Sequence, residues 1–397
     1  MERATVHELQ LARRMSRLGT ETAFEVLNKA RALERQGRNI IHLEIGEPDF
    51  DTPSNVVEAG VTALRKGWTH YGPSAGQPEL RQAIAEYVAR TRGVKVTSDE
   101  VVVVPGGKPI IFFTILSLID EGDEVIYPNP GFPIYESMIN YVGGRAVPIQ
   151  LREEREFSLD VEELNSLISD RTKLIILNSP QNPTGGVLSR SDIERIAKAI
   201  GDRNIMVLAD EIYSRLLFDG GRHFSIMSVP GMQERTILLD GFSKTYAMTG
   251  WRMGYGVMRP DLAAHMTRLM TNSNSCTASF TQIAGIEAIT GDQTSVDRMR
   301  DEFQGRRDVF VAGLNQIKGF SCRMPKGAFY VFPNITQTGW KSKPLADALL
   351  EQAGVAALSG TSFGHFGEGY LRFSVANSLE NLQQALQRID QWTKKNL

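Results

Sequence analysis

Residues 173–214 read KLIILNSPQNPTGGVLSRSDIERIAKAIGDRNIMVLADEIYS and indicate the architecture most clearly. Two apolar runs, LIIL and IMVLA, lie on either side of a segment that predicts a helix near 191–200. Neither run alternates with polar residues, which is typical of strands covered by helices on both faces. The stretch therefore predicts two strands of a buried, mostly parallel sheet joined by a helix.

The same alternation of strand-like and helix-like segments extends in both directions from this stretch. The expected strands are IIHLEI, VVVV, EVIYP, TILLDG and RMGYGVM, and the expected helices span 22–35, 55–66, 78–92, 134–142 and a segment from about 109. Such alternation is typical of an α/β layered sheet. We predict an α/β fold whose large domain has a central, mostly parallel sheet with helices on both faces.

The pattern changes after about residue 290. A long charged helix near 296–317 is followed by the strand-like AFYVFP, a short helix at 345–352, the strand-like GYLRFSVA and a final helix. These elements predict a smaller α+β domain.

Composition and charge exclude several function classes. The 397 residues carry 44 Lys plus Arg against 46 Asp plus Glu, for a net charge of -2, which argues against binding to nucleic acid or to an anionic membrane. The apolar tract at 101–119 is interrupted by PGGKP, and the start, MERATVHELQLARR, lacks an apolar leader segment. From the lack of an anchor and of an export signal we expect a cytoplasmic location. The two cysteines and six histidines show no metal-ligand spacing, so we expect no metal site.

Four loops that follow predicted strands hold unusual polar residues. They are Pro105-Gly106-Gly107-Lys108, Asn178 to Gly185 with Asn182 between two prolines, Asp210-Glu211-Ile212-Tyr213, and Ser243-Lys244 followed by Arg252. Ligands of such sheets bind at the carboxyl ends of the strands. Each loop alone fits an ordinary turn, cap or surface residue equally well, and Gly-Gly before a helix is a weak indication of a phosphate site.

Taken together, the four loops suit one ligand. A lysine beside hydroxyls and an arginine suits a carbonyl compound that carries a phosphate, and an aspartate at a strand end suits a protonated ring nitrogen. A tyrosine and an asparagine suit a ring phenolate. Pyridoxal phosphate has all of these features, and we predict it as the cofactor.

The segments GEPDFDTP, YGPSAGQPELR, PNPGFPIYE, NSPQNPTG, ADEIYS, GFSKTYAMTGWRMGY and RFSVAN resemble those of the fold-type I, class I aminotransferases, in the family's order and over essentially the whole chain. The resemblance implies a homodimer whose active sites lie at the subunit interface. It also implies a large cofactor-binding domain at 46–290 and a small domain formed from both chain ends, 1–45 and 291–397.

The resemblance implies roles for individual residues. Lys244 would bond covalently to the cofactor and move a proton between the substrate Cα and the cofactor. Asp210 would stay ionised against the pyridine nitrogen. Tyr213 and Asn182 would hydrogen-bond the ring phenolate, and Phe132 would stack on the ring.

The remaining contacts implied by the resemblance concern the phosphate and the substrate. Gly107, Lys108, Ser243 and Arg252 would surround the phosphate, with Tyr71 reaching it from the partner subunit. Arg372 would hold the substrate α-carboxylate, with Gly46 beside it and Asn182 also in contact with substrate. An arginine suits a carboxylate because its guanidinium binds in a bidentate manner.

Some positions depart from the family pattern. Phe132 lacks the ring N–H of the tryptophan found in aspartate-selective members, whereas Lys108 matches a lysine that recognises a distal carboxylate in one bacterial branch. Gly241 replaces the family's phosphate serine, and residues 271–279 match loosely a segment that contributes across the dimer interface.

The expected activity is transfer of an amino group from an L-amino acid to a 2-oxo acid by a ping-pong cycle, either aspartate/glutamate-type or with a broad donor range and 2-oxoglutarate or pyruvate as acceptor. A β-eliminating carbon–sulfur lyase that uses Lys244 and Arg372 is the alternative. A cofactor-sensing regulator ranks last, because no basic DNA-binding module is present in this sequence.

Overall fold

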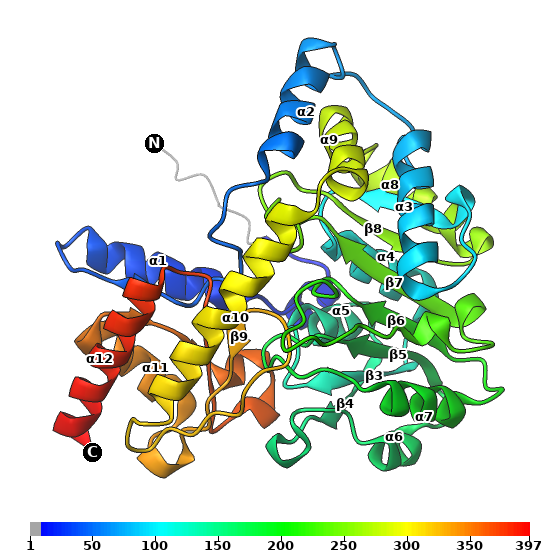
Figure 1. Cartoon of the computed structure of the whole chain (residues 1–397). Coiled ribbons are helices and arrows are strands. Elements are labelled where there is room, and N and C mark those ends of the chain that lie inside the picture. Colours follow the sequence, from blue (N-terminus) through cyan, green and yellow to red (C-terminus); the bar gives the residue numbers. More distant parts are fainter. Residues whose placement is uncertain (1–8) are drawn as a thin grey trace, which may run out of the picture.

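A computed structural model describes residues 9–397 and has a seven-stranded central sheet (Figure 1). Its strands lie in the order β2-β8-β7-β6-β5-β3-β4, and only β8 runs antiparallel to the others. The bounds are β2 (Val101–Val104), β3 (Glu124–Asn129), β4 (Arg145–Gln150), β5 (Thr172–Asn178), β6 (Met206–Asp210), β7 (Thr236–Gly241) and β8 (Gly254–Val257). The prediction of a mostly parallel central sheet is confirmed.

Helices cover both faces of this sheet. One face packs against α4 (Lys108–Leu118), α5 (Ile134–Val142) and α8 (Pro260–Asn274). The other face packs against α3 (Pro78–Arg92), α6 (Val161–Leu167), α7 (Arg190–Ile200) and α9 (Ser279–Thr290), and α2 (Ser54–Arg65) lies against α9. Strands β2 and β7 are buried at every residue and β5 at all but Lys173, because both faces are covered, which explains why their sequences do not alternate.

The two ends of the described chain pack together beside the sheet, in what we call the end lobe (Figure 1). It comprises α1 (Thr22–Glu34), β1 (Ile41–His42), α10 (Thr294–Leu314), β9 (Tyr330–Val331), α11 (Ser342–Ala348), β10 (Val355–Ala356), β11 (Leu358–Ser359), β12 (Leu371–Ser374) and α12 (Leu379–Asn396). Strand β1 pairs in parallel with β10, and β12 pairs with both β11 and β9. The exact domain boundaries stay a prediction.

Several elements differ from the sequence prediction. The run IIHLEI forms only the two-residue β1, which lies outside the central sheet, because Ile41 and Leu43 pack into the core of the end lobe. The helix expected at 345–352 begins at Ser342 and widens into a π-helical turn over Leu349–Ala353. Strands β4, β10 and β11 and helices α6, α8 and α9 were not predicted.

No helix in residues 9–397 is both long and apolar enough to cross a lipid bilayer. Residues 1–8 lie outside the described part of the chain, and with them most of the charged start on which the expectation of no leader segment rests.

Candidate active site

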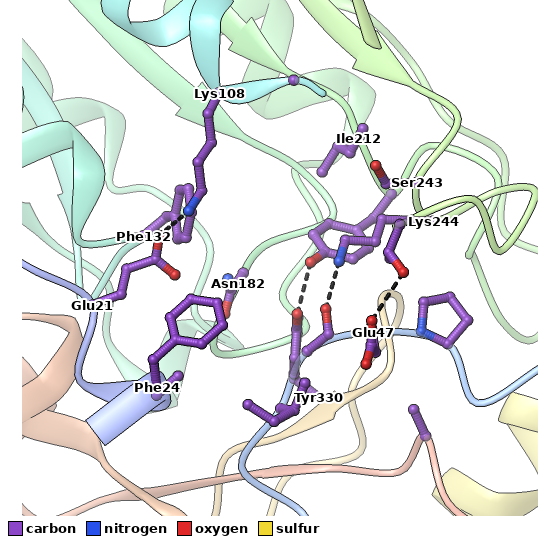
Figure 2. Close-up of a pocket in the computed structure, with 18 of the residues that line it drawn as sticks. Glu21, Phe24, Glu47, Lys108, Phe132, Asn182, Ile212, Ser243, Lys244 and Tyr330 are labelled. Atoms are coloured by element: carbon purple, nitrogen blue, oxygen red, sulfur yellow. Dashed lines mark hydrogen bonds and ion pairs between the residues drawn. The ribbon is translucent and has the colours of Figure 1, made fainter. Parts of the chain in front are cut away.

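A cavity of about 1010 Å³ lies where the carboxyl ends of β5, β6 and β7 face the end lobe. In the sheet register Asn178 at the end of β5 pairs with Asp210 at the end of β6, so the loops after these strands meet at one edge. Segment 45–49 and helix α1 line the opposite side (Figure 2). All the predicted cofactor and substrate residues line this cavity except Tyr71: Gly46, Gly107, Lys108, Phe132, Asn182, Asp210, Tyr213, Ser243, Lys244, Arg252 and Arg372.

Lys244 reaches the cavity from the turn that follows β7. Its amine donates a hydrogen bond to the backbone carbonyl of Gly46 (Figure 2). Removal of the amine from water lowers the pKa of Lys244 to about 8. The negative charge of Glu47 opposes this shift, and the positive charges of Arg372 and Arg252 add to it. With this pKa about a tenth of the amine is neutral at pH 7, far more than for an ordinary lysine, as a nucleophile or base requires.

Asp210 is buried at the end of β6, where the Tyr135 hydroxyl on α5 donates a 2.6 Å hydrogen bond to its Oδ2. Burial raises the pKa of Asp210 to about 6, while the hydrogen bond from Tyr135 opposes the rise. A cation placed beside this carboxylate would favour its ionised form. Tyr135 was missed in the sequence analysis, although a tyrosine on the buried face of a helix signals a hydroxyl that needs a partner.

Arg372 is buried, with its guanidinium carbon 4.5 Å from the ring centre of Tyr330 and 4.9 Å from that of Phe363. Its Nη1 donates to Asn182 Oδ1 at 3.3 Å, and its Nη2 donates to the carbonyl of Glu44. Its Nε is buried and has no hydrogen-bond partner among residues 9–397. A guanidinium that is held in place by two hydrogen bonds and two aromatic rings, and that has an unsatisfied donor, is suited to binding a carboxylate.

The hydroxyls of Tyr213 and Tyr330 lie 2.7 Å apart, which joins the loop after β6 to β9 of the end lobe (Figure 2). Burial raises the pKa of both phenols, so both hydroxyls are protonated at neutral pH. At Gly46 an added Cβ would lie 2.2 Å from the Tyr330 hydroxyl, so only glycine fits beside this tyrosine. Tyr330 was also missed, since nothing in AFYVFP distinguishes it from core aromatic residues.

The N-terminus of α4 forms a compact cradle with β8 and Arg252. Gly106 has a φ of +81°, and an added Cβ would lie 2.1 Å from Arg252 Nη2, so the guanidinium lies against the glycine turn. An added Cβ at Gly254 would lie 2.7 Å from the Gly107 nitrogen. Arg252 itself has a φ of +54°, a conformation rare outside glycine and associated with functional sites. A helix N-terminus beside an arginine favours a phosphate.

Gly241, where the family has a serine, pairs with Gly254 across β7 and β8. An added Cβ at Gly241 would lie 3.0 Å from the Cα of Gly254 and 3.2 Å from the Ile212 side chain. The close approach of the two strands explains the glycine.

Lys108 points away from this cradle. Figure 2 shows its side chain running toward Phe132 and Glu21 rather than toward Ser243. Its Nζ forms an ion pair with Glu21 at the start of α1 and lies 5.6 Å from the Phe132 ring centre.

Tyr71 lies outside the cavity, and its side chain is 88% exposed. The 271–279 segment lies beside it, since the Ser279 hydroxyl donates to the carbonyl of His70 at 2.6 Å. The structure therefore brings these two predicted interface segments together, on a surface separate from the cavity.

The residues around the cavity fit the cofactor predicted from the sequence. An amine of lowered pKa lies between a buried carboxylate and a phosphate-type cradle, and an arginine with a free donor lies in the same cavity. Pyridoxal phosphate needs these groups for its aldehyde, ring nitrogen and phosphate, and its amino acid substrate needs the last one.

Known proteins agree with this interpretation. The family described as aminotransferase class I and II matches residues 38–389. An aspartate aminotransferase from Pyrococcus horikoshii is 41% identical over 92% of this chain and 93% of its own length. The aromatic-amino-acid aminotransferase 2 of Thermococcus litoralis is 38% identical over 90% and 92%. The solved aspartate aminotransferase from Thermus thermophilus with maleate superposes with a TM-score of 0.93 and 37% identity, covering 97% of this chain and all of that one.

Proposed function

Because the chain belongs to the class I and II aminotransferase family, we propose that the cavity between the sheet and the end lobe is the site at which it transfers amino groups. The chain is a pyridoxal phosphate-dependent aminotransferase. The observation that carries the placement of its active site is that Lys244, Asp210 and Arg372 line one cavity.

The resemblance to the family and the shared cavity support one set of cofactor contacts. Lys244 would bond to the cofactor, Asp210 would face its ring nitrogen, and Phe132 would stack on its ring. Tyr213 and Asn182 would bind the ring oxygen. Gly107, Ser243 and Arg252 would hold the phosphate through the positive end of α4, a hydroxyl and a guanidinium. When bound, pyridoxal phosphate supplies an aldehyde that bonds to amines and a ring that withdraws electrons from the substrate Cα.

Arg372 holds the α-carboxylate of the substrate. A carboxylate would meet two donors of Arg372. These are Nε, which has no partner among residues 9–397, and Nη1, which donates to Asn182 in this structure. The rings of Tyr330 and Phe363 fix the plane of the guanidinium, so little side-chain entropy is lost when substrate binds. Gly46 leaves room beside this carboxylate.

Lys244 would act as the base at the substrate Cα once the substrate amine has replaced it on the cofactor. Its released amine would take the Cα proton and later return a proton to the cofactor carbon that is bonded to the amino nitrogen. Its lowered pKa, caused mainly by loss of water around the amine, keeps a reactive neutral fraction available. Asp210 remains buried and ionised beside the cationic ring, and Tyr135 orients its carboxylate.

The substrate range we propose is broad: acidic and neutral or aromatic donors, with 2-oxoglutarate or pyruvate as acceptor. Relatives named for aspartate and for aromatic amino acids match this chain to similar extents, and the solved relative from T. thermophilus carries maleate, a dicarboxylate. Lys108 offers a cation for a second carboxylate, and Phe132, Phe24 and Ile111 offer an apolar wall. The comparisons do not support the carbon–sulfur lyase alternative.

We further propose a homodimer in a reducing compartment such as the cytoplasm. The exposed aromatic side chain of Tyr71, which lies beside the 271–279 segment, supports an interface at this surface. Cys276 and Cys322 are both free thiols, as is usual for proteins of reducing compartments.

Trapping the covalent bond tests the proposed site. The protein is loaded with pyridoxal phosphate, reduced with borohydride and digested, and the modified peptide is identified by mass spectrometry. We expect Lys244 to be the only modified lysine. In Lys244→Ala both the modification and the turnover should be lost. A modified lysine elsewhere, or turnover that survives Lys244→Ala, would contradict the proposal.

A further inference from the structure

The end of the cavity next to α1 contains an ion pair that the amino-transfer chemistry does not require. Glu21 immediately precedes α1, and its carboxylate pairs with Lys108 Nζ at the start of α4 (Figure 2). The side chain of Glu21 is 17% exposed and that of Lys108 is 43% exposed. The pair therefore joins the end lobe to the sheet across the cavity and is partly exposed to solvent.

Apolar side chains line the same cavity as this pair. Lys108 Nζ lies 5.6 Å from the ring centre of Phe132. Phe24, one helical turn after Glu21, is 57% exposed, and it lines the cavity together with Ile111 and Leu27. This end of the cavity can thus meet either a charged or an apolar substrate side chain.

Glu21 also lies close to Arg372. The two residues line the same small recess, with Asn182 and Phe363 also in its wall. Burial lowers the pKa of Arg372, and the negative charge of Glu21 opposes this fall to a smaller extent than Tyr330, Tyr213 and Glu44 do. Glu21 is therefore an anion close to both cations, Lys108 and Arg372, that would receive the two carboxylates of an acidic substrate.

We infer that Glu21 is a specificity-determining residue that competes with the second carboxylate of an acidic substrate for Lys108. This inference rests on the proposed function, in which the α-carboxylate lies on Arg372. With a neutral or aromatic substrate the pair stays closed, so no lysine charge is left unpaired against the apolar side chain. With a dicarboxylic substrate Lys108 exchanges Glu21 for the substrate carboxylate, and Glu21 turns toward solvent.

The exchange is feasible because the pair is partly exposed. Ion pairs in contact with water are weak, so a substrate carboxylate can replace one without a large loss. The same weakness limits the effect of Glu21 to about 2- to 10-fold on each substrate class. Glu21 thereby broadens the donor range: it lowers the preference for acids and protects the binding of neutral side chains.

The variant Glu21→Gln tests the inference in the cofactor-loaded enzyme. We expect kcat/KM for aspartate and glutamate to rise about 2- to 10-fold, mainly through a lower KM, and kcat/KM for phenylalanine and leucine to fall. Glu25→Gln is the matched control, because Glu25 lies on the same helix, is exposed and does not line the cavity. It makes the same change in charge and should leave the ratio of acidic to neutral kcat/KM unchanged.

A binding measurement provides a readout that does not depend on turnover. Maleate and 3-phenylpropionate are titrated into the loaded enzyme by calorimetry, and Glu21→Gln should tighten maleate binding relative to 3-phenylpropionate. In a Lys108→Gln background the same substitution should no longer change this ratio, because the cation for which Glu21 competes is gone.

The outcomes separate this inference from the proposed function. Suppose that the enzyme transaminates and that Glu21→Gln changes neither the ratio of acidic to neutral kcat/KM nor the ratio of maleate to 3-phenylpropionate affinity. The role of Glu21 is then wrong and the proposed function stands. An effect that persists in the Lys108→Gln background also contradicts competition for Lys108. If the parent enzyme transfers no amino group from any donor, the proposed function fails as well.

Discussion

The chemistry of Lys244 depends strongly on its surroundings. Loss of water around the amine and the nearby arginines lower its pKa from 10.5 to about 8, so the amine is mostly protonated below pH 8 and mostly neutral above it. Only the neutral amine attacks an aldehyde.

We expect the rate at which the apoprotein bonds to pyridoxal phosphate to reach half of its maximum near pH 8. Nα-acetyl-lysine, whose amine has an ordinary pKa, is the control. Its rate should reach half of its maximum about two pH units higher. Glu47→Gln should move the half-point below that of the parent, because the charge of Glu47 raises the pKa of Lys244. Stopped-flow absorbance measures the rate. A half-point close to that of the control amine would contradict the account of Lys244.

Tyr135 acts at the same scale through Asp210. Its hydrogen bond lowers the pKa of a carboxyl that burial raises to about 6, so Tyr135→Phe should raise that pKa further. A larger fraction of Asp210 is then neutral at pH 7. The pH below which cofactor affinity falls should therefore rise by about one unit. Equilibrium titration of the apoprotein with cofactor from pH 5 to 8 measures the shift. Tyr141→Phe on the same helix is the control. If cofactor affinity depends on pH in the same way in the parent and in Tyr135→Phe, this role of Tyr135 is ruled out.

At the scale of elements, the strand ends and the N-terminus of α4 bring the site together. The sequence predicted these strands and loops because apolar runs without alternation and loops rich in glycine and proline are local signals. It did not predict the contacts of Tyr330 and Glu21, because these arise only when the end lobe closes against the sheet. It placed Lys108 with the phosphate residues, whereas its side chain turns toward α1.

The glycine turn before α4 gives a prediction at this scale. Gly106→Ala introduces a Cβ into a left-handed backbone and against the Arg252 guanidinium, so cofactor affinity should fall by at least about tenfold. Gly93→Ala is the control: Gly93 ends α3 with a φ of +66° but has no atoms within 4 Å of an added Cβ. Both variants strain the backbone, but only the first should weaken binding of the cofactor. Equal affinities of the two variants would show that the turn does not bind the phosphate.

At the scale of the whole molecule, the sequence predicted the α/β fold and a second region formed by the end of the chain. It predicted a strand over IIHLEI without its partner, because the pairing of β1 with β10 joins residues more than 300 positions apart. No local pattern encodes such a contact. The exposed Tyr71 has an expected role only in an assembly of two chains.

We therefore expect a dimer by analytical ultracentrifugation, and complementation between two impaired variants. In a hybrid of Tyr71→Ala with Lys244→Ala, one site has both residues if Tyr71 serves the partner's cofactor. Mixing the variants under conditions that exchange subunits should restore part of the activity. Hybrid dimers that form without any gain in activity would contradict a role for Tyr71 across the interface.

The most direct test of the central claim is a single-turnover absorbance scan of the cofactor-loaded enzyme with a panel of amino acids. We expect acidic and aromatic donors to convert the bound cofactor to its amine form, and 2-oxoglutarate to reverse the change. Conversion should be lost in Lys244→Ala. Release of ammonia without a stable amine form of the cofactor, or no conversion by any donor, would contradict amino-group transfer at this site.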